Sequence, residues 1–119
     1  MDVGVDMVSV PRMQRLLDRF GPRALNRLFT KTEQQICLGR RDAARCFAAR
    51  FAAKEALLKA LGTGLRHGVR WTDISVELDP SGRPRYRLHP RLEARLRGKI
   101  PRVSLSHEKE YALALCILF

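Results

Sequence analysis

The feature that most constrains this fold is a long alanine-rich stretch, residues 43–61, because no proline or glycine interrupts it. Alanine has the highest intrinsic helix propensity, so the stretch is predicted to form one helix. Asp42 is a suitable N-cap residue before it, and Gly62 stands where a helix normally stops. A chain of 119 residues has room for one core. We therefore expect a single domain, residues 1–119, organised around this helix.

The segments that flank this helix are of two kinds. Before it, residues 3–9 alternate as in a strand, and short helical stretches follow from Pro11, Pro22 and Thr30. Thr30 and Glu33 have the spacing of a capping box. After it, the pattern predicts a hairpin of residues 71–78 and 85–88, a short basic helix at 91–98, and strands at 103–106 and 111–119. This order of elements predicts an α+β fold.

The last predicted strand differs from an ordinary half-buried strand. Residues 111–119 are apolar on both alternating faces. A strand of this kind must be covered on both sides. The core covers one side, and we expect another subunit to cover the other.

The net charge points to a negatively charged partner. Lysine and arginine number 23 against 12 acidic residues, which gives +11. An excess of this size suits a phosphorylated metabolite, an acidic protein or nucleic acid.

The cysteines and the N-terminus predict a cytoplasmic protein. Cys37, Cys46 and Cys116 are odd in number and form no CxxC pair, which argues against a disulfide framework and a zinc site. They are expected to be reduced thiols. The N-terminus lacks the basic segment of a signal peptide, and no run approaches the roughly 18 apolar residues of a membrane span. We therefore expect no association with a membrane.

Two carboxylates are candidates for a metal site. Asp6 lies in an otherwise apolar strand, where a carboxylate needs a cation or hydrogen-bond donors, although a turn at the strand end would also satisfy it. Glu55 lies at the border of the apolar stripe of the long helix. If the two meet, they match Mg²⁺, which completes its shell with waters and phosphate oxygens. Lys59, one turn after Glu55, would reach the same phosphate, whereas a surface ion pair between Glu55 and Lys59 is the alternative.

Two further motifs allow a ligand role as well as a structural one. Gly62, Thr63 and Gly64 end the helix, and glycine also lets backbone N–H groups approach a ligand closely. Ser106 and His107 lie at the end of a strand without a GxSxG motif. Contact with phosphate oxygens is therefore a better interpretation of this pair than nucleophilic catalysis.

Together, these segments resemble the small bacterial holo-(acyl-carrier-protein) synthases, the compact class of 4′-phosphopantetheinyl transferases. The matching pieces follow the family's order over nearly the whole chain: GVD at 4–6, FTKTE at 29–33, RFAAKEALLKALGTG at 50–64, WTDISV at 71–76, SGRP at 81–84 and SLSHEKEYALA at 104–114. The resemblance implies a long central helix packed on a small, mainly antiparallel sheet, in a homotrimer with sites between subunits. It also implies Mg²⁺-dependent transfer of phosphopantetheine from coenzyme A to a serine of an apo acyl carrier protein, with release of adenosine 3′,5′-bisphosphate.

The resemblance assigns roles to particular residues. Asp6 and Glu55 would hold Mg²⁺, and Glu55 and Lys59 would be catalytic, with either Glu55 or a metal-bound water accepting the serine proton. The coenzyme A pocket would be formed by Lys59, Gly62, Thr63, Gly64, Ser106 and His107. The carrier protein would dock on Arg12, Arg15, Arg19 and Phe51.

Two residues depart from the family pattern, and one alternative function stays open. Ser9 stands where many members carry a glutamate, and Pro11 precedes the docking helix, which puts the start of that helix in question. The alternative is a small basic nucleic-acid-binding domain, which the 18 arginines would favour. The sequence shows no zinc-finger, helix-turn-helix, RNP or KH motif to support it.

Overall fold

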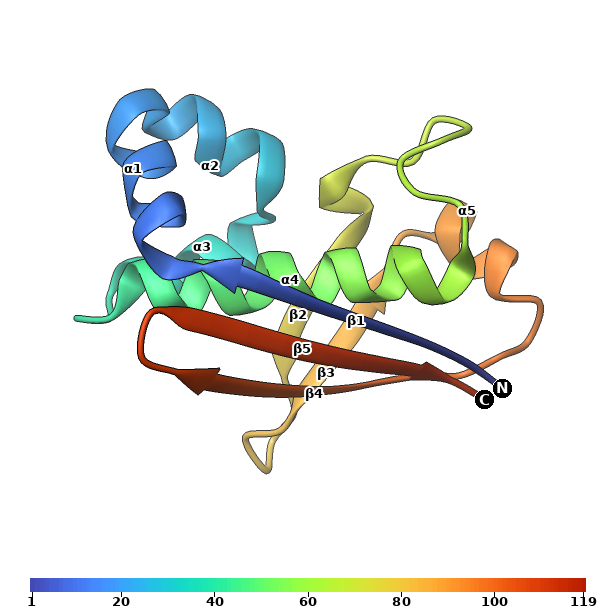
Figure 1. Cartoon of the computed structure of the whole chain (residues 1–119). Coiled ribbons are helices and arrows are strands. Elements are labelled where there is room, and N and C mark those ends of the chain that lie inside the picture. Colours follow the sequence, from blue (N-terminus) through green and yellow to red (C-terminus); the bar gives the residue numbers. More distant parts are fainter.

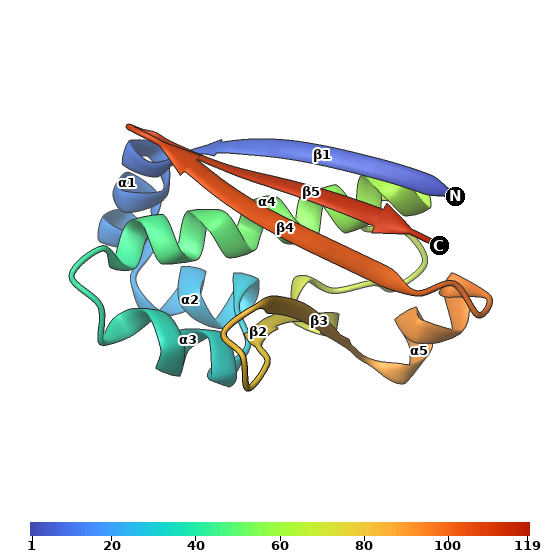
Figure 2. The ribbon, with the colours of Figure 1, turned by 90° about the horizontal axis from the view of Figure 1, so that it is seen from below.

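The long helix lies in the middle of the molecule, between two layers. In the computed structural model, which describes residues 1–119, α4 (Ala43–Leu61) packs against an antiparallel sheet on one side (Figures 1 and 2). That sheet has the order β1 (Asp2–Ser9), β5 (Tyr111–Leu118), β4 (Pro101–Glu108). The other side of α4 is covered by α2 (Pro22–Leu28), α3 (Lys31–Leu38) and the hairpin of β2 (Ile74–Leu78) and β3 (Pro84–Leu88). The predicted α+β fold is therefore confirmed.

Alanines on α4 let the sheet approach the helix closely. Ala52, Ala53 and Ala56 have no exposed surface. Opposite them, β1 passes the helix at Gly4, where an added Cβ would lie 2.0 Å from the carbonyl oxygen of Ala56. Because side chains two residues apart share a face of a strand, this close passage also directs Asp6 toward α4.

A Gly4→Ala substitution is expected to lower the free energy of unfolding by about 3 kcal/mol or more, since two backbones would have to separate. Urea unfolding followed by circular dichroism measures the loss. Gly39→Ala is the matched control, because Gly39 has a φ of −81° and no atom within 4 Å of an added Cβ. This control should change stability by less than about 1 kcal/mol. Equal effects at the two positions would contradict the close approach.

The helix that carries the predicted docking residues starts with a side-chain cap. α1 (Val10–Phe20) has Ser9 at the N-cap, whose Oγ accepts a hydrogen bond from the backbone N–H of Arg12 at 3.3 Å. Pro11 occupies the first turn, where a missing N–H is harmless. Both departures from the family pattern thus have a structural account at the start of this helix.

One further helix end agrees with its prediction, and two differ from theirs. The capping box of Thr30 and Glu33 is present. Asp42 occupies the N-cap position of α4, but its side chain makes no capping bond and instead accepts from Arg40 at 2.9 Å. The expected helix at 91–98 is wrong in extent, since α5 (Pro90–Glu93) and a 3-10 turn (Ala94–Leu96) end where Arg97 takes a φ of 52°.

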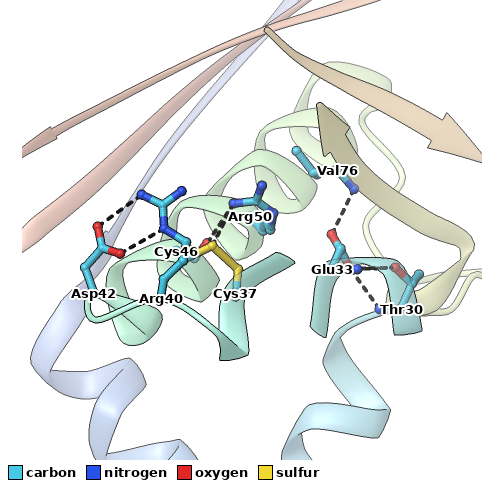
Figure 3. Close-up of a disulfide and its surroundings, with 8 residues drawn as sticks. All are labelled: Thr30, Glu33, Cys37, Arg40, Asp42, Cys46, Arg50 and Val76. Atoms are coloured by element: carbon cyan, nitrogen blue, oxygen red, sulfur yellow. Dashed lines mark hydrogen bonds and ion pairs between the residues drawn. A yellow bond between two sulfur atoms is a disulfide. The ribbon is translucent and has the colours of Figure 1, made fainter. Parts of the chain in front are cut away.

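The expectation of three reduced thiols is also wrong. Cys37 in the last turn of α3 and Cys46 in the first turn of α4 form a disulfide, and only Cys116 is free (Figure 3). Packing of the two helices brings the Cα atoms of the pair to 5.5 Å, within the usual range for a disulfide. Sequence spacing alone does not reveal this proximity, because it depends on how α3 folds back onto α4.

The outer face of the sheet is apolar and exposed. Val3, Val5 and Met7 of β1 are 62%, 51% and 60% exposed. Their partners across the strand pair, Leu115 beside Val5 and Leu113 beside Met7, are about 40% exposed. The second apolar face expected for the last strand therefore lies on the surface of the single chain. No helix is both long enough and apolar enough to span a membrane.

Candidate active site

Asp6 and Lys59 meet where β1 crosses the second half of α4. The Lys59 Nζ donates to Asp6 Oδ1 at 2.8 Å and to the carbonyl oxygen of Val5 at 3.1 Å. The Asp6 side chain is 16% exposed and that of Lys59 is 53% exposed. The surface ion pair between Glu55 and Lys59, the structural alternative, is absent, because Lys59 is drawn across to the strand.

Glu55 completes a group of two carboxylates and one amine. Burial raises the pKa of Glu55, the nearby Asp6 carboxylate raises it further, and Lys59 lowers it in part. The hydrogen bond to Asp6 raises the pKa of Lys59. A carboxylate that is half-buried beside a second one is stabilised in its charged form by a cation placed between them.

These residues fit a Mg²⁺ site better than a site for a softer metal. The donors are carboxylate oxygens, and the structure has no cluster of three or more His, Cys, Asp or Glu side chains placed to hold a metal. Mg²⁺ commonly uses one or two carboxylates and takes its other ligands from water and substrate phosphates. Asp6 and Glu55 are the residues that would hold it, as the sequence predicted, and this assignment stays a prediction.

Two cavities border this group. One of about 490 Å³ is lined by Glu55, Lys59, Gly62, Gly64 and Trp71, together with Leu58 and Leu65. The other, of about 440 Å³, has a mainly apolar lining that includes Asp6, Arg12 and Phe51. The rings of Phe51 and Trp71 are in contact, with centroids 4.8 Å apart. The aromatic pair thus joins the walls of the two cavities.

The predicted docking residues lie on the side of Asp6. Arg12, Arg15 and Arg19 are exposed on α1, and Arg12 reaches the cavity that holds Asp6 and Phe51. The guanidinium of Arg19 lies 5.2 Å from the centre of the Phe20 ring. α1 therefore presents a positively charged surface next to the carboxylates.

Three predicted coenzyme A ligands lie elsewhere in the single chain. Thr63 lines a different cavity, with His67 and Arg95. Ser106 and His107 lie on β4, at the edge of the sheet opposite β1, since Asp6 pairs with Ala114 and Ala114 with Leu105. At about 4.8 Å per strand, roughly 10 Å of sheet separates β4 from β1. One chain does not bring these two residues to Glu55 and Lys59.

A buried ion pair that the sequence did not predict lies beneath the site. The Lys54 Nζ donates to Glu33 Oε1 at 2.7 Å and to the carbonyl oxygens of Leu28 at 2.6 Å and Trp71 at 3.2 Å. The backbone N–H groups of Thr30 and Val76 donate to the Glu33 carboxylate. Both side chains are fully buried. Lys54 thereby fixes the turn of α4 that carries Glu55 against three neighbouring segments. Burial lowers the pKa of Lys54, and the nearby Glu33 opposes that effect.

A signal for this pair was present in the sequence. A lysine whose neighbours one helical turn away are Phe51, Leu57 and Leu58 lies on a buried face and needs a carboxylate partner. Glu33, identified from its capping spacing alone, was the available one.

The fold and the site define a class of protein. Hard oxygen ligands, a lysine beside them and a basic approach surface are the parts that a metal-assisted phosphoryl transfer requires. The chain belongs to the 4′-phosphopantetheinyl transferase superfamily, whose family model matches residues 2–116.

Several relatives are named holo-(acyl-carrier-protein) synthase. A protein of Trichlorobacter lovleyi named holo-(acyl-carrier-protein) synthase is 46% identical over 121 residues, which cover 99% of this chain and 96% of the relative. The crystal structure of a holo-(acyl-carrier-protein) synthase from Neisseria meningitidis matches with a TM-score of 0.90 and 33% identity, covering 99% of this chain and 97% of that one. The synthase from Bacillus anthracis in complex with CoA (3′,5′-ADP) matches with a TM-score of 0.82 and 33% identity, covering 98% and 94%. The family inferred from the sequence motifs is thus confirmed.

Proposed function

We propose that this protein is a holo-(acyl-carrier-protein) synthase, which transfers the 4′-phosphopantetheine group of coenzyme A to a serine of an apo acyl carrier protein. Adenosine 3′,5′-bisphosphate is the second product. The observation that carries the proposal is the meeting of Asp6, Glu55 and Lys59 beside two cavities. The names of the relatives, and the coenzyme A bound to one of them, support both substrates.

Coenzyme A takes the cavity on the side of Glu55. Lys59 is one of its lining residues, and its exposed ammonium is free to move from Asp6 to a pyrophosphate oxygen. Gly62 and Gly64 leave the end of α4 open to a close approach by the ligand. Mg²⁺ held by Asp6 and Glu55 would neutralise the pyrophosphate and make the attacked phosphorus more electrophilic. Lys59 stabilises the charge that develops on the departing nucleotide.

The carrier protein approaches from the side of Asp6. The arginines of α1 attract its acidic surface, and the cavity between Arg12, Asp6 and Phe51 admits its serine. The serine oxygen forms the new bond to phosphorus as the bond to the nucleotide breaks on the opposite side. Glu55 would receive the serine proton, with a water molecule as the alternative acceptor.

Charge reversal on α1 should affect one substrate only. We expect Arg15→Glu to raise KM for the carrier protein on the order of tenfold and to leave KM for coenzyme A unchanged, because α1 lies on the acceptor side. Arg41→Glu, in the exposed loop between α3 and α4, is the matched control with the same change in net charge. Steady-state kinetics at fixed ionic strength give both constants. A parallel rise for both substrates would place the docking surface elsewhere.

The complete site requires a second copy of the chain, in a homotrimer. The exposed apolar face of β1 and β5 is a surface that a neighbouring copy would cover. Ser106 and His107, which lie across the sheet from Asp6, would then serve the coenzyme A of the neighbouring site. Thr63 belongs to the same coenzyme A pocket in this proposal.

Mixing two inactive variants tests this division of the site. Glu55→Gln and His107→Ala are each expected to be inactive alone. After unfolding and refolding together in equal amounts, roughly one quarter of sites in a cyclic trimer would combine native Glu55 from one subunit with native His107 from the next. Recovery of about that fraction of wild-type activity supports shared sites. Absence of recovery in mixed trimers would mean that each site draws both residues from one chain.

The function itself is tested by mass. The protein is incubated with coenzyme A, Mg²⁺ and an apo carrier protein, and the carrier is weighed by mass spectrometry. An increase of one phosphopantetheine group on a serine is the expected result. No increase, together with retention on nucleic acid at physiological salt, would favour the nucleic-acid-binding alternative. A cytoplasmic location is part of the same proposal.

A further inference from the structure

Arg50 is a buried cation with no carboxylate partner. Its residue is 4% exposed, it takes part in no ion pair within 4.0 Å, and its Nε has no hydrogen-bond partner. The carboxylate that acts on it from a distance, Glu33, is already bound by Lys54. Taking a guanidinium out of water without a counter-charge is costly. The structure therefore contains a buried positive charge that its surroundings leave uncompensated.

What Arg50 does contact is the disulfide. Its Nη1 donates to the Cys46 carbonyl oxygen at 3.3 Å and lies 3.1 Å from Cys46 Sγ, and Figure 3 shows the guanidinium beside the sulfur pair. A disulfide sulfur is neutral and a weak acceptor, so it compensates the charge poorly. A thiolate at the same position would supply a full negative charge in direct contact. Adjacent cations lower the pKa of a cysteine thiol and make the thiolate available for reaction.

We propose that Cys37, Cys46 and Arg50 form a thiol–disulfide exchange site, in which Cys46 is the nucleophile and the co-substrates are small disulfides and small thiols. In the reduced protein, the Cys46 thiolate attacks a small disulfide, forms a mixed disulfide and releases one small thiolate. Cys37, as a thiolate, then attacks Cys46 Sγ, forms the internal disulfide and releases the second. Two protein thiols are oxidised and one small disulfide is reduced to two thiols.

The start of α4 gives a route to the sulfur. Cys46 is 6% exposed and lies in the first turn of the helix, while Cys37 has no exposed surface. The side chain of Asp42 does not cap this turn, because it is held by Arg40. A helix end without a side-chain cap opens more readily than the interior of the helix. Cys46 is therefore the sulfur that a small disulfide meets first.

Equilibrium with glutathione tests the role of Arg50. The folded protein is equilibrated at pH 7 with mixtures of reduced and oxidised glutathione, quenched with acid, alkylated and analysed by peptide mass. Arg50→Met should shift the equilibrium toward the disulfide by about tenfold, because the reduced state loses the cation that stabilises its thiolate. Arg50→Lys keeps the positive charge, so its equilibrium should lie close to that of the wild-type protein. Arg45→Met is the matched control, since Arg45 pairs with Asp42 and should leave the equilibrium unchanged. An unchanged equilibrium in Arg50→Met overturns the proposal.

Alkylation of the reduced wild-type protein gives a second test that needs no variant. With a limiting amount of iodoacetamide at pH 7, Cys46 is expected to react several times faster than Cys37, with the buried Cys116 as internal reference. Faster labelling of Cys37, or equal labelling of all three thiols, would show that Cys46 is not the activated sulfur.

Discussion

Replacement of Glu55 by glutamine is expected to reduce Mg²⁺-dependent transfer on the order of 10³-fold while the fold stays intact. An uncharged amide is a poorer ligand than a carboxylate for a hard cation and accepts no proton. The same change removes a charge that burial and Asp6 both disfavour, which is why the pKa of Glu55 is raised. The melting temperature should therefore stay the same or rise. Transfer is followed by the mass of the carrier protein, at saturating coenzyme A and over a range of Mg²⁺ concentrations.

Glu93→Gln is the control for the Glu55 experiment. Glu93 is an exposed carboxylate on α5, so its replacement makes the same chemical change far from Asp6. Its activity should be within about twofold of wild type, as for ordinary surface substitutions. Full activity of Glu55→Gln, or a similar loss in both variants, would remove Glu55 from the reaction.

Loss of the buried lysine should have the largest effect on stability. Lys54→Met is expected to lower the free energy of unfolding by about 3–5 kcal/mol, because the Glu33 carboxylate would stay buried without its cation. Two backbone carbonyl oxygens, of Leu28 and Trp71, would also lose their donor. Urea unfolding monitored by circular dichroism gives the change.

Two further variants separate the ion pair from the general loss of a lysine. Adding Glu33→Gln to Lys54→Met removes the uncompensated charge and should recover at least half of the lost stability. Lys59→Met, on the same helix but with a half-exposed ion pair, should cost within about 1 kcal/mol. Similar losses for the two lysines would mean that burial of the Lys54 pair contributes little.

Local patterns predicted much of the fold because their causes are local. The alanine stretch, the glycine that ends it, the capping box at Thr30 and the alternation of the first strand all depend on residues a few positions apart. The helix at 91–98 was overestimated because its basic residues favour a helix, yet Arg97 and Gly98 adopt positive φ angles. The position at which this helical segment ends depends on contacts with other elements.

The candidate site shows the same difference between local patterns, which the sequence predicts, and contacts between distant elements, which it does not. Asp6, Glu55 and Lys59 were predicted to meet, and the structure places Lys59 on Asp6 rather than on Glu55. The sequence did not predict that Glu33 and Lys54 pair or that Cys37 and Cys46 join, because both contacts depend on the packing of α3 against α4. The separation of His107 from Asp6 follows from strand order, which is equally a property of the whole chain.

The pairing of the first strand with the last determines when this protein can fold. β1 takes its hydrogen bonds from β5, and both termini lie together at one end of the molecule (Figure 1). During synthesis, α4 and the apolar residues of β1 stay uncovered until β5 has emerged from the ribosome. Folding of the sheet is therefore expected to follow the emergence of β5, with the helices formed earlier. Deletion of β5 would remove the middle strand of the sheet, since β5 lies between β1 and β4.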